Sequence, residues 1–111
     1  SLRILAPVDF ALQRVVHVRY AGAPLFQINE LEYADGSVLA NVYQSSWIMR
    51  IDPATGLVRS AISFANLYPD RPATAEVMNG IALAPDGRQL LLTGKMWPRL
   101  FEVRLLPPPA Q

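Results

Sequence analysis

The sequence predicts an all-β protein, and more specifically a partial β-propeller built from antiparallel four-stranded blades. One observation is the run of short apolar segments separated by turn residues. A second is an internal repeat, since Asn29 recurs as Asn79 and Trp47 recurs as Trp97, each after 50 residues. A third is the pair of Asp-Gly turns at 35–36 and 86–87, a strong hairpin signal. A period near 50 residues made of short strands is typical of propeller blades.

Residues 1–24 are expected to supply the two outer strands of one blade. These strands are predicted at 2–5 and 14–20. In the second segment, alternate residues form a more polar set and a more apolar set, and many of them have high β-propensity. This is the pattern of a strand whose two faces have different surroundings. His17 falls in the more polar set, so we expect it at the surface.

Residues 25–66 are expected to form a complete blade. Its four strands are predicted at 31–34, 38–43, 47–51 and 58–64. The Asp-Gly turn at 35–36 joins the first two strands. A longer turn, Asp52-Pro53-Ala54-Thr55-Gly56, joins the last two, because Asp, Pro and Gly each favour turn geometry.

Residues 67–106 are expected to form a blade without its fourth strand, with strands at 81–84, 89–93 and 100–105. The three prolines at 107–109 stop that blade and begin a tail, 107–111. Only 72–78 suggests a helical turn. The total is about two and a half blades, too few to close a ring. We therefore expect an incomplete propeller with exposed sheet edges.

Composition excludes several classes of function. The 111 residues are 51% hydrophobic and 17% charged, which is typical of a folded domain rather than a disordered chain. The net charge of +1 comes from interspersed acids and bases, so we expect neither a nucleic-acid nor a membrane partner. With no cysteine and one histidine, we expect no cofactor and no bound metal. The first residues do not resemble a signal peptide.

Strand direction alone predicts where a site would lie. Antiparallel strands bring the start of the first strand and the end of the second to the same rim of a blade. Asn29 and Asn79 precede first strands, whereas Tyr43, Gln44 and Lys95 follow second strands. We expect all five on one rim, and the Asp-Gly hairpins on the opposite rim. Loops held by a rigid scaffold commonly carry functional groups.

Each candidate residue also has a plain structural interpretation. Asn29 and Asn79 could satisfy backbone groups at strand starts, as asparagine does in turns. Lys95 could be a solvated loop cation. Trp47 and Trp97 could pack between blades, because aromatic side chains bury large areas.

Two carboxylates, Glu30 and Glu32, fall on one face of a predicted strand. An acid/base pair is one interpretation of such spacing. Hydrogen-bonded or solvated carboxylates are the commoner one, and the sequence favours it here.

Four segments together carry a resemblance to a known family. They are Asn-Glu-Leu-Glu-Tyr at 29–33, Ala-Asn-Val-Tyr-Gln at 40–44, Arg-Ile-Asp-Pro-Ala-Thr-Gly at 50–56 and Thr-Gly-Lys-Met-Trp-Pro at 93–98. In this order they resemble the C-terminal half of the plant and bacterial type of glutaminyl cyclase, or glutamine cyclotransferase. The resemblance implies a five-bladed β-propeller that closes N-terminal glutamine to pyroglutamate and releases ammonia.

The resemblance also implies roles for individual residues. Asn29 and Lys95 match family residues that line the substrate pocket, and we assign them the catalytic role of stabilising the developing oxyanion. Tyr43 stands where the family has a tryptophan against which glutamine packs. With Tyr43 we expect Gln44, Asn79 and Trp97 to bind substrate.

The family's proton-transferring glutamate belongs to an earlier blade and has no match in this sequence. We therefore expect the chain to be part of a glutaminyl-peptide cyclotransferase, an acyltransferase, and to be inactive alone. The expected partners are a peptide or protein with N-terminal glutamine and the missing N-terminal half of the propeller. The resemblance implies a secreted or periplasmic protein. The alternatives are a non-catalytic propeller module for binding or scaffolding and, less favoured, a calcium-dependent lactonase-like propeller.

Overall fold

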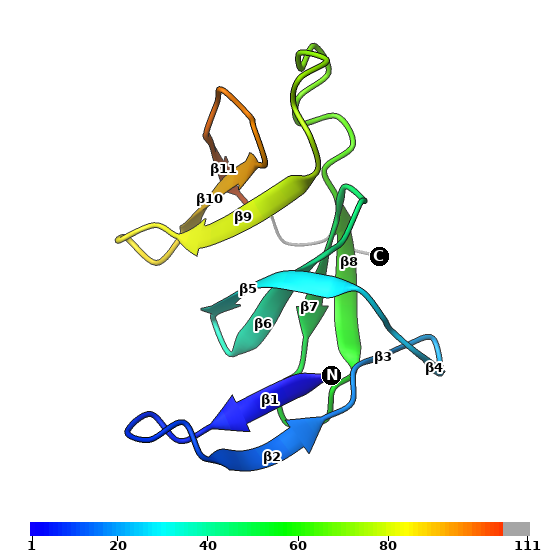
Figure 1. The fold of residues 1–111 in the computed structure, drawn as a ribbon, viewed down its shortest axis with the longest axis vertical. Helices are drawn as coiled ribbons and strands as arrows, with labels where there is room; N and C mark the ends of the chain where they lie inside the picture. The colour runs from blue at the N-terminus through cyan, green and yellow to red at the C-terminus, as the bar shows by residue number, and fades with distance from the viewer. Residues whose placement is uncertain (106–111) are drawn as a thin grey trace, which may run out of the picture.

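The computed structural model describes residues 1–105, which form eleven β-strands and no helix (Figure 1). The tail predicted at 107–111 lies outside the described residues, as does residue 106. No helix in the described part of the chain has the length and apolar character needed to span a membrane. The strands are β1 (Leu2–Leu5), β2 (Leu12–Val16), β3 (Arg19–Tyr20), β4 (Ala23–Pro24), β5 (Ile28–Ala34), β6 (Ser37–Val42), β7 (Trp47–Ile51), β8 (Val58–Ser63), β9 (Met78–Leu83), β10 (Gln89–Gly94) and β11 (Phe101–Arg104).

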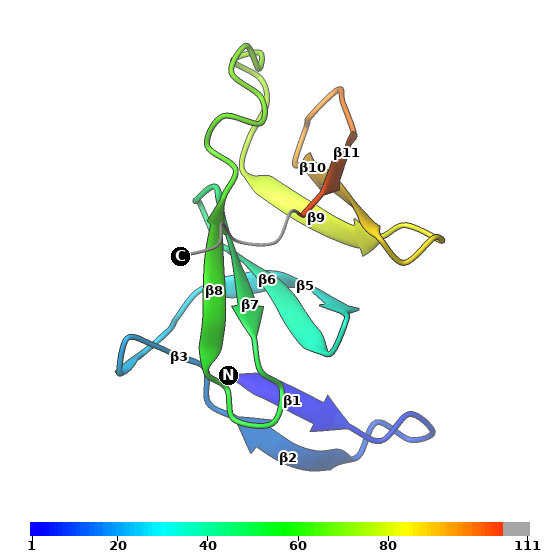
Figure 2. The same cartoon turned by 180° about the vertical axis from the view of Figure 1, so that it is seen from behind.

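Three antiparallel sheets are stacked on one another (Figures 1 and 2). The central sheet has the order β5-β6-β7-β8, in which every strand pairs with its neighbour in sequence. One face of it packs on the first sheet, β1-β2, and the other on the third sheet, β9-β10-β11. The strands β3 and β4 form a small separate hairpin. This stack of sequential meanders is a partial β-propeller, as the sequence predicted.

The alternation of side chains along β6 divides the core into two layers. Successive residues of a strand point to opposite faces. Ala40 accordingly packs toward the first sheet, with Leu2 and Val16, while Leu39 packs toward the third sheet, with Leu92. All of these side chains are buried, and burying a leucine or valine contributes roughly 1.5–3 kcal/mol. The two apolar layers hold the three sheets together.

The strands β1, β5 and β9 run in the same direction, and each ends at a tight loop on the same side of the molecule (Figure 1). The Asp-Gly turns after β5 and β9 therefore lie together, as predicted. We call this end of the stack the hairpin rim. The opposite end, where β5 and β9 begin and β6 and β10 finish, is called the site rim.

The strand predicted at 14–20 is wrong in its second half. The structure ends β2 at Val16 and starts β3 at Arg19. The reason is a contact with the central sheet: the Arg19 backbone N–H donates to the Gly56 carbonyl at 2.9 Å, and Arg19 forms a parallel bridge with Leu57. Val18 is buried at the same place. The chain thus leaves the first sheet to bind the turn between β7 and β8.

That turn is stabilised by its own side chains. The Ala54 backbone N–H donates to Asp52 Oδ1 at 2.9 Å, and the Arg59 guanidinium lies 3.2 Å from Asp52 Oδ2. The bond from Ala54, reinforced by the charge of Arg59, lowers the pKa of the Asp52 carboxyl from its usual value. The segment predicted as a turn from Asp, Pro and Gly therefore forms one.

Most strand limits agree with the predicted ones to within one residue, but β5 and β9 begin earlier than expected. They start at Ile28 and Met78, and the pairing register shifts near the start of each. The cause in each case is an irregularity of the bulge type, which lets one strand carry an extra residue. The helical turn suggested at 72–78 is absent, and the Ala75 N–H donates instead to the Pro72 carbonyl in a single tight turn.

Candidate functional site

The site rim carries all six residues singled out from the sequence. Two are asparagines at the bulged starts of first strands, and four belong to the turns that follow β6 and β10. The two asparagines lie inside β5 and β9, whereas the sequence predicted them just before these strands. Bulges are frequent near active sites because they change the direction of a side chain. The six residues are Asn29, Asn79, Tyr43, Gln44, Lys95 and Trp97.

Asn79 has an unsatisfied polar atom. Its Oδ1 is buried and is the one such side-chain atom without a hydrogen-bond partner among residues 1–105. Buried polar atoms in folded proteins nearly always have a partner, because leaving one unpaired costs roughly 1–3 kcal/mol. A free acceptor at this rim is therefore suited to receive a donor from another molecule or from another part of the propeller. Asn29, by contrast, is exposed to solvent.

Three residues of the site rim have left-handed backbone conformations although none is a glycine. They are Gln27 with φ of 63°, Gln44 with φ of 61° and Met96 with φ of 62°. Such conformations are costly for residues with a Cβ atom and persist where the surroundings enforce them. One cause is visible, since the Tyr43 N–H donates to the Gln27 carbonyl at 2.7 Å. The rim is thus a set of tightly held turns.

Lys95 extends the ladder between β9 and β10 beyond the strands themselves. Its N–H donates to the Val77 carbonyl at 2.9 Å, and the Glu76 N–H donates to the Lys95 carbonyl at 2.8 Å. Its Nζ lies 3.4 Å from the Glu76 carboxylate. Both side chains are largely exposed, so the ion pair contributes only about 0–1 kcal/mol. The backbone therefore positions Lys95, while its ammonium group stays accessible.

Glu76 is not among the residues predicted from the sequence. No motif marks this residue, which lies 19 residues (95 − 76) before Lys95 in the chain. Only the pairing of β9 with β10 brings the two together. Glu76 also lines a cavity of about 270 Å³ at the site rim, between the turn after β6 and the segment before β9, with Gln44, Arg71 and Met78.

Trp97 covers the backbone of the Thr-Gly-Lys segment. Its ring packs directly on Gly94 and meets Tyr68 and Phe101 edge-on, at centroid distances of 5.4 and 6.1 Å. Its Nε1–H donates to the Glu76 carbonyl at 2.8 Å. These partners all lie in residues 67–105, so the contacts are packing within one blade rather than between blades, and Trp47 is 44% exposed. A contact between Trp97 and substrate stays a prediction.

Replacing Gly94 with alanine should destabilise the protein. The new Cβ would overlap the indole of Trp97, so the ring or the strand must move. Overpacking of this kind typically costs about 1–3 kcal/mol. The free energy of unfolding, measured in urea, should fall by that amount for Gly94→Ala. A double-mutant cycle with Trp97→Leu should recover most of the loss, and an equal loss in both backgrounds would contradict this explanation.

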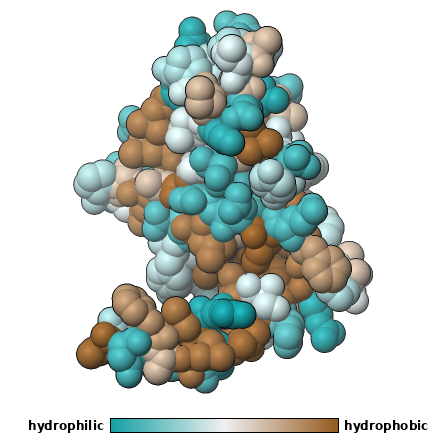
Figure 3. All heavy atoms as spheres, in the orientation of Figure 1, coloured by the Kyte–Doolittle hydropathy of each residue, from teal (hydrophilic) through white to brown (hydrophobic). Residues whose placement is uncertain are grey.

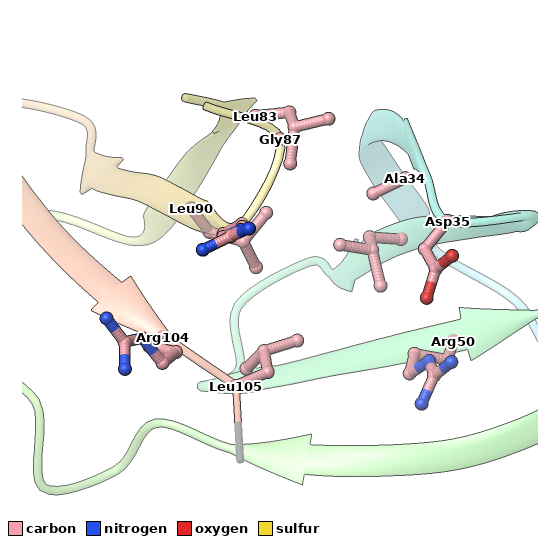
Figure 4. Close-up of a pocket in the computed structure, with 10 residues that line it drawn as sticks. Ala34, Asp35, Arg50, Leu83, Gly87, Leu90, Arg104 and Leu105 are labelled. Atoms are coloured by element: carbon pink, nitrogen blue, oxygen red, sulfur yellow. The ribbon is translucent and has the colours of Figure 1, made fainter. Parts of the chain in front are cut away.

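A larger cavity, of about 710 Å³, lies at the hairpin rim between the central and third sheets (Figure 4). Asp35 and Gly87 of the two Asp-Gly turns line it, with Arg50, Arg88 and Arg104. None of the six predicted residues belongs to it. Size alone therefore does not mark the predicted site, which lies at the other end of the stack.

The groups available at the site rim are amides, the Lys95 ammonium with the Glu76 carboxylate beside it, the Arg71 guanidinium and aromatic rings. Such groups suit a neutral polar substrate on which negative charge develops during reaction. Within residues 1–105, no three histidine, aspartate or glutamate side chains lie together in a way that could hold a metal ion.

Stacked sequential four-stranded and shorter meanders define this chain as part of a β-propeller. Residues 1–105 match the family described as glutamine cyclotransferase, and the chain belongs to that family. This confirms the resemblance drawn from the four sequence segments.

Two relatives show how much of a family member this chain represents. A curated Arabidopsis thaliana protein named glutaminyl-peptide cyclotransferase is 39% identical over 92 residues, which is 79% of this chain and 29% of that protein. The crystal structure of Myxococcus xanthus glutaminyl cyclase superimposes with a TM-score of 0.81 at 44% identity, over 90% of this chain and 45% of that one. The chain thus spans less than half the length of either relative. The roles of the six rim residues stay predictions.

Proposed function

We propose that this chain is part of an enzyme that converts the N-terminal glutamine of peptides to pyroglutamate with release of ammonia. The observation that carries the proposal is the family match along residues 1–105. The names of the two relatives agree with it, since one is a glutaminyl-peptide cyclotransferase and the other a glutaminyl cyclase. The site rim, with its amides and its single lysine, offers groups that suit this reaction.

The reaction forms one bond and breaks another within the same residue. The α-amino nitrogen of the substrate attacks its own side-chain amide carbon, and the bond from that carbon to the amide nitrogen then breaks. The amide nitrogen takes up the proton that the amine gives up and leaves as ammonia. Because attack is intramolecular, holding the two groups in contact supplies much of the rate.

In this proposal some residues of the site rim stabilise developing charge and others bind the substrate. Asn29 and Lys95 stabilise the negative charge that develops on the amide oxygen, because both present N–H donors. Tyr43 supplies an aromatic face for the glutamine side chain, and Gln44, Asn79 and Trp97 complete the binding surface. The unpaired Oδ1 of Asn79 suits the substrate amine, which is a donor. Proton transfer falls to a group outside this chain.

We also propose that the remaining blades of the ring cover the face of the central sheet beside β1. There Leu31 and Tyr33 of β5 are 47% and 63% exposed, and β1 pairs with β2 alone among the described strands. Figure 3 shows hydrophobic surface over the first sheet and where it meets the central sheet. Apolar patches with open strand edges mark association sites.

The proposed function is tested by assaying the complete protein and the 111-residue chain side by side. The complete protein should release ammonia from a peptide that begins with glutamine, detected enzymatically and by mass spectrometry. We expect none from the chain alone, because it spans less than half the length of its relatives and has no match to the glutamate that the resemblance assigns to proton transfer. An N-acetylated peptide of the same sequence is the control, since its blocked nitrogen cannot attack. The proposal fails if the complete protein leaves the unblocked peptide unchanged.

A further inference from the structure

We infer that Asn41 is a positioning residue, which holds the two strands of the site rim at a set distance from each other. Asn41 lies near the end of β6 and is only 1% exposed. Its Oδ1 accepts a hydrogen bond from the Glu30 backbone N–H at 2.6 Å, and its Nδ2–H donates to the Met78 carbonyl at 2.8 Å. One buried amide thus binds two strands of different sheets.

The two partners of Asn41 are the immediate neighbours of the two site asparagines. Glu30 follows Asn29 on β5, and Met78 precedes Asn79 on β9. The strands β5 and β9 belong to different sheets and share no ladder of backbone hydrogen bonds. The Asn41 side chain is therefore the polar connection that the structure shows between these two strands at the site rim.

The bulge in β5 explains why a side chain is needed here. Ile28 pairs with Val42 and Leu31 pairs with Ala40, so the two residues between them face Asn41 alone. This leaves the Glu30 N–H without a regular ladder partner, and the Asn41 oxygen takes the place of the missing carbonyl. The same side chain then turns its nitrogen toward β9. The bulge in β5 and the two hydrogen bonds of the Asn41 side chain therefore act together to connect β5 to β9.

Few residues could replace asparagine at this position. The bridge needs an acceptor for one strand and a donor for the other on a single short planar group. Aspartate keeps the acceptor and loses the donor, and it would set a carboxylate against the Met78 carbonyl. Leucine has a similar volume and offers neither. Buried polar groups that lose a partner favour rearrangement of what surrounds them.

The consequence for the site is geometric and rests on the proposed function. If Asn29 and Asn79 act on the same substrate, their separation is set by the distance between β5 and β9. A displacement of about 1 Å at reacting groups can lower a rate by roughly 10²-fold. Asn41 would therefore affect turnover without touching the substrate.

The test uses the complete protein with Asn41→Leu and Asn41→Asp. We expect kcat for a glutaminyl peptide to fall by about 10- to 10²-fold in Asn41→Leu, since positioning is lost. Asn41→Asp should also lower kcat, because it keeps the bond to Glu30 but loses the donor to the Met78 carbonyl and so breaks the connection between β5 and β9. The matched control is Ser37→Ala, which removes a fully buried hydroxyl from the same strand at the hairpin rim, where it accepts from Arg59 at 2.6 Å. At a temperature where all variants are folded, Ser37→Ala should keep the parental kcat.

A second readout does not depend on turnover. In nitrogen-15 spectra, the side-chain amide signals of Asn29 and Asn79 should shift in Asn41→Leu, and the Glu30 amide should exchange faster with solvent. Both should stay parental in Ser37→Ala. If the parental protein has no cyclase activity, the proposed function fails, and these signals still decide the inference. If Asn41→Leu does not fold, the side-chain amide signal of Asn79 is compared between Asn41→Asp and the parental protein. Parental kcat and unshifted signals in the folded Asn41 variants would overturn the inference.

Discussion

Replacing Lys95 with alanine in the complete protein should lower turnover of a glutaminyl peptide by about 10²–10³-fold. Removal of one donor aimed at a developing oxyanion typically has an effect of this size, equivalent to about 2.7–4 kcal/mol. Lys95 is the single lysine of the chain, and its ammonium is accessible at the site rim. Asn29→Ala should have an effect of similar size, because the exposed amide of Asn29 lies on the same rim.

The measurement is kcat and KM for the two variants at equal thermal stability. Stability should change little, since both side chains are exposed and the ion pair of Lys95 with Glu76 is a weak surface pair. The control is Glu32→Gln on the strand that carries Asn29, which should affect turnover much less. If Lys95→Ala and Asn29→Ala both keep parental rates, the assignment of these residues to the site is wrong.

Replacing Gly56 with alanine should cause the largest loss of stability among single substitutions at glycine. Gly56 has a φ of +80°, a conformation that costs a residue with a Cβ atom about 1–2 kcal/mol. In addition, the new Cβ would overlap the backbone carbonyl of His17, which cannot move without breaking the contact between the first and central sheets. Overpacking adds about 1–3 kcal/mol. Together these two losses amount to much of the free energy of unfolding of a typical protein, which is about 5–15 kcal/mol.

Urea unfolding of Gly56→Ala and Gly36→Ala distinguishes the backbone cost of a positive φ from the cost of the overlap with His17. Gly36 has a similar φ of +76°, but nothing lies within 4 Å of its hypothetical Cβ. Gly36→Ala should therefore show only the backbone cost, and Gly56→Ala the sum of both. Equal losses in the two variants would show that the approach of His17 does not matter.

Local features of the chain made most of the fold predictable. The strand limits of β1, β7 and β8 follow from the alternation of side chains and from turn residues such as Asp35-Gly36, because these act over a few neighbouring positions. The repeat of 50 residues indicated blades, and antiparallel connection then assigned Lys95 and Gln44 to one rim. The family itself was evident from four ordered segments of the sequence.

What the sequence by itself determined is thus the class of fold, the order of the strands and the end of the stack where the candidate residues lie. Only the tertiary structure decided how that end is held together. The break after Val16, the pairing of Glu76 with Lys95 and the bridge from Asn41 to Met78 all join segments far apart in the chain, 37 residues in the last case. The physical reason is that the break and the bridge depend on how one sheet packs against the next, while the Glu76–Lys95 pair depends on the pairing of β9 with β10. No local pattern of residues records either.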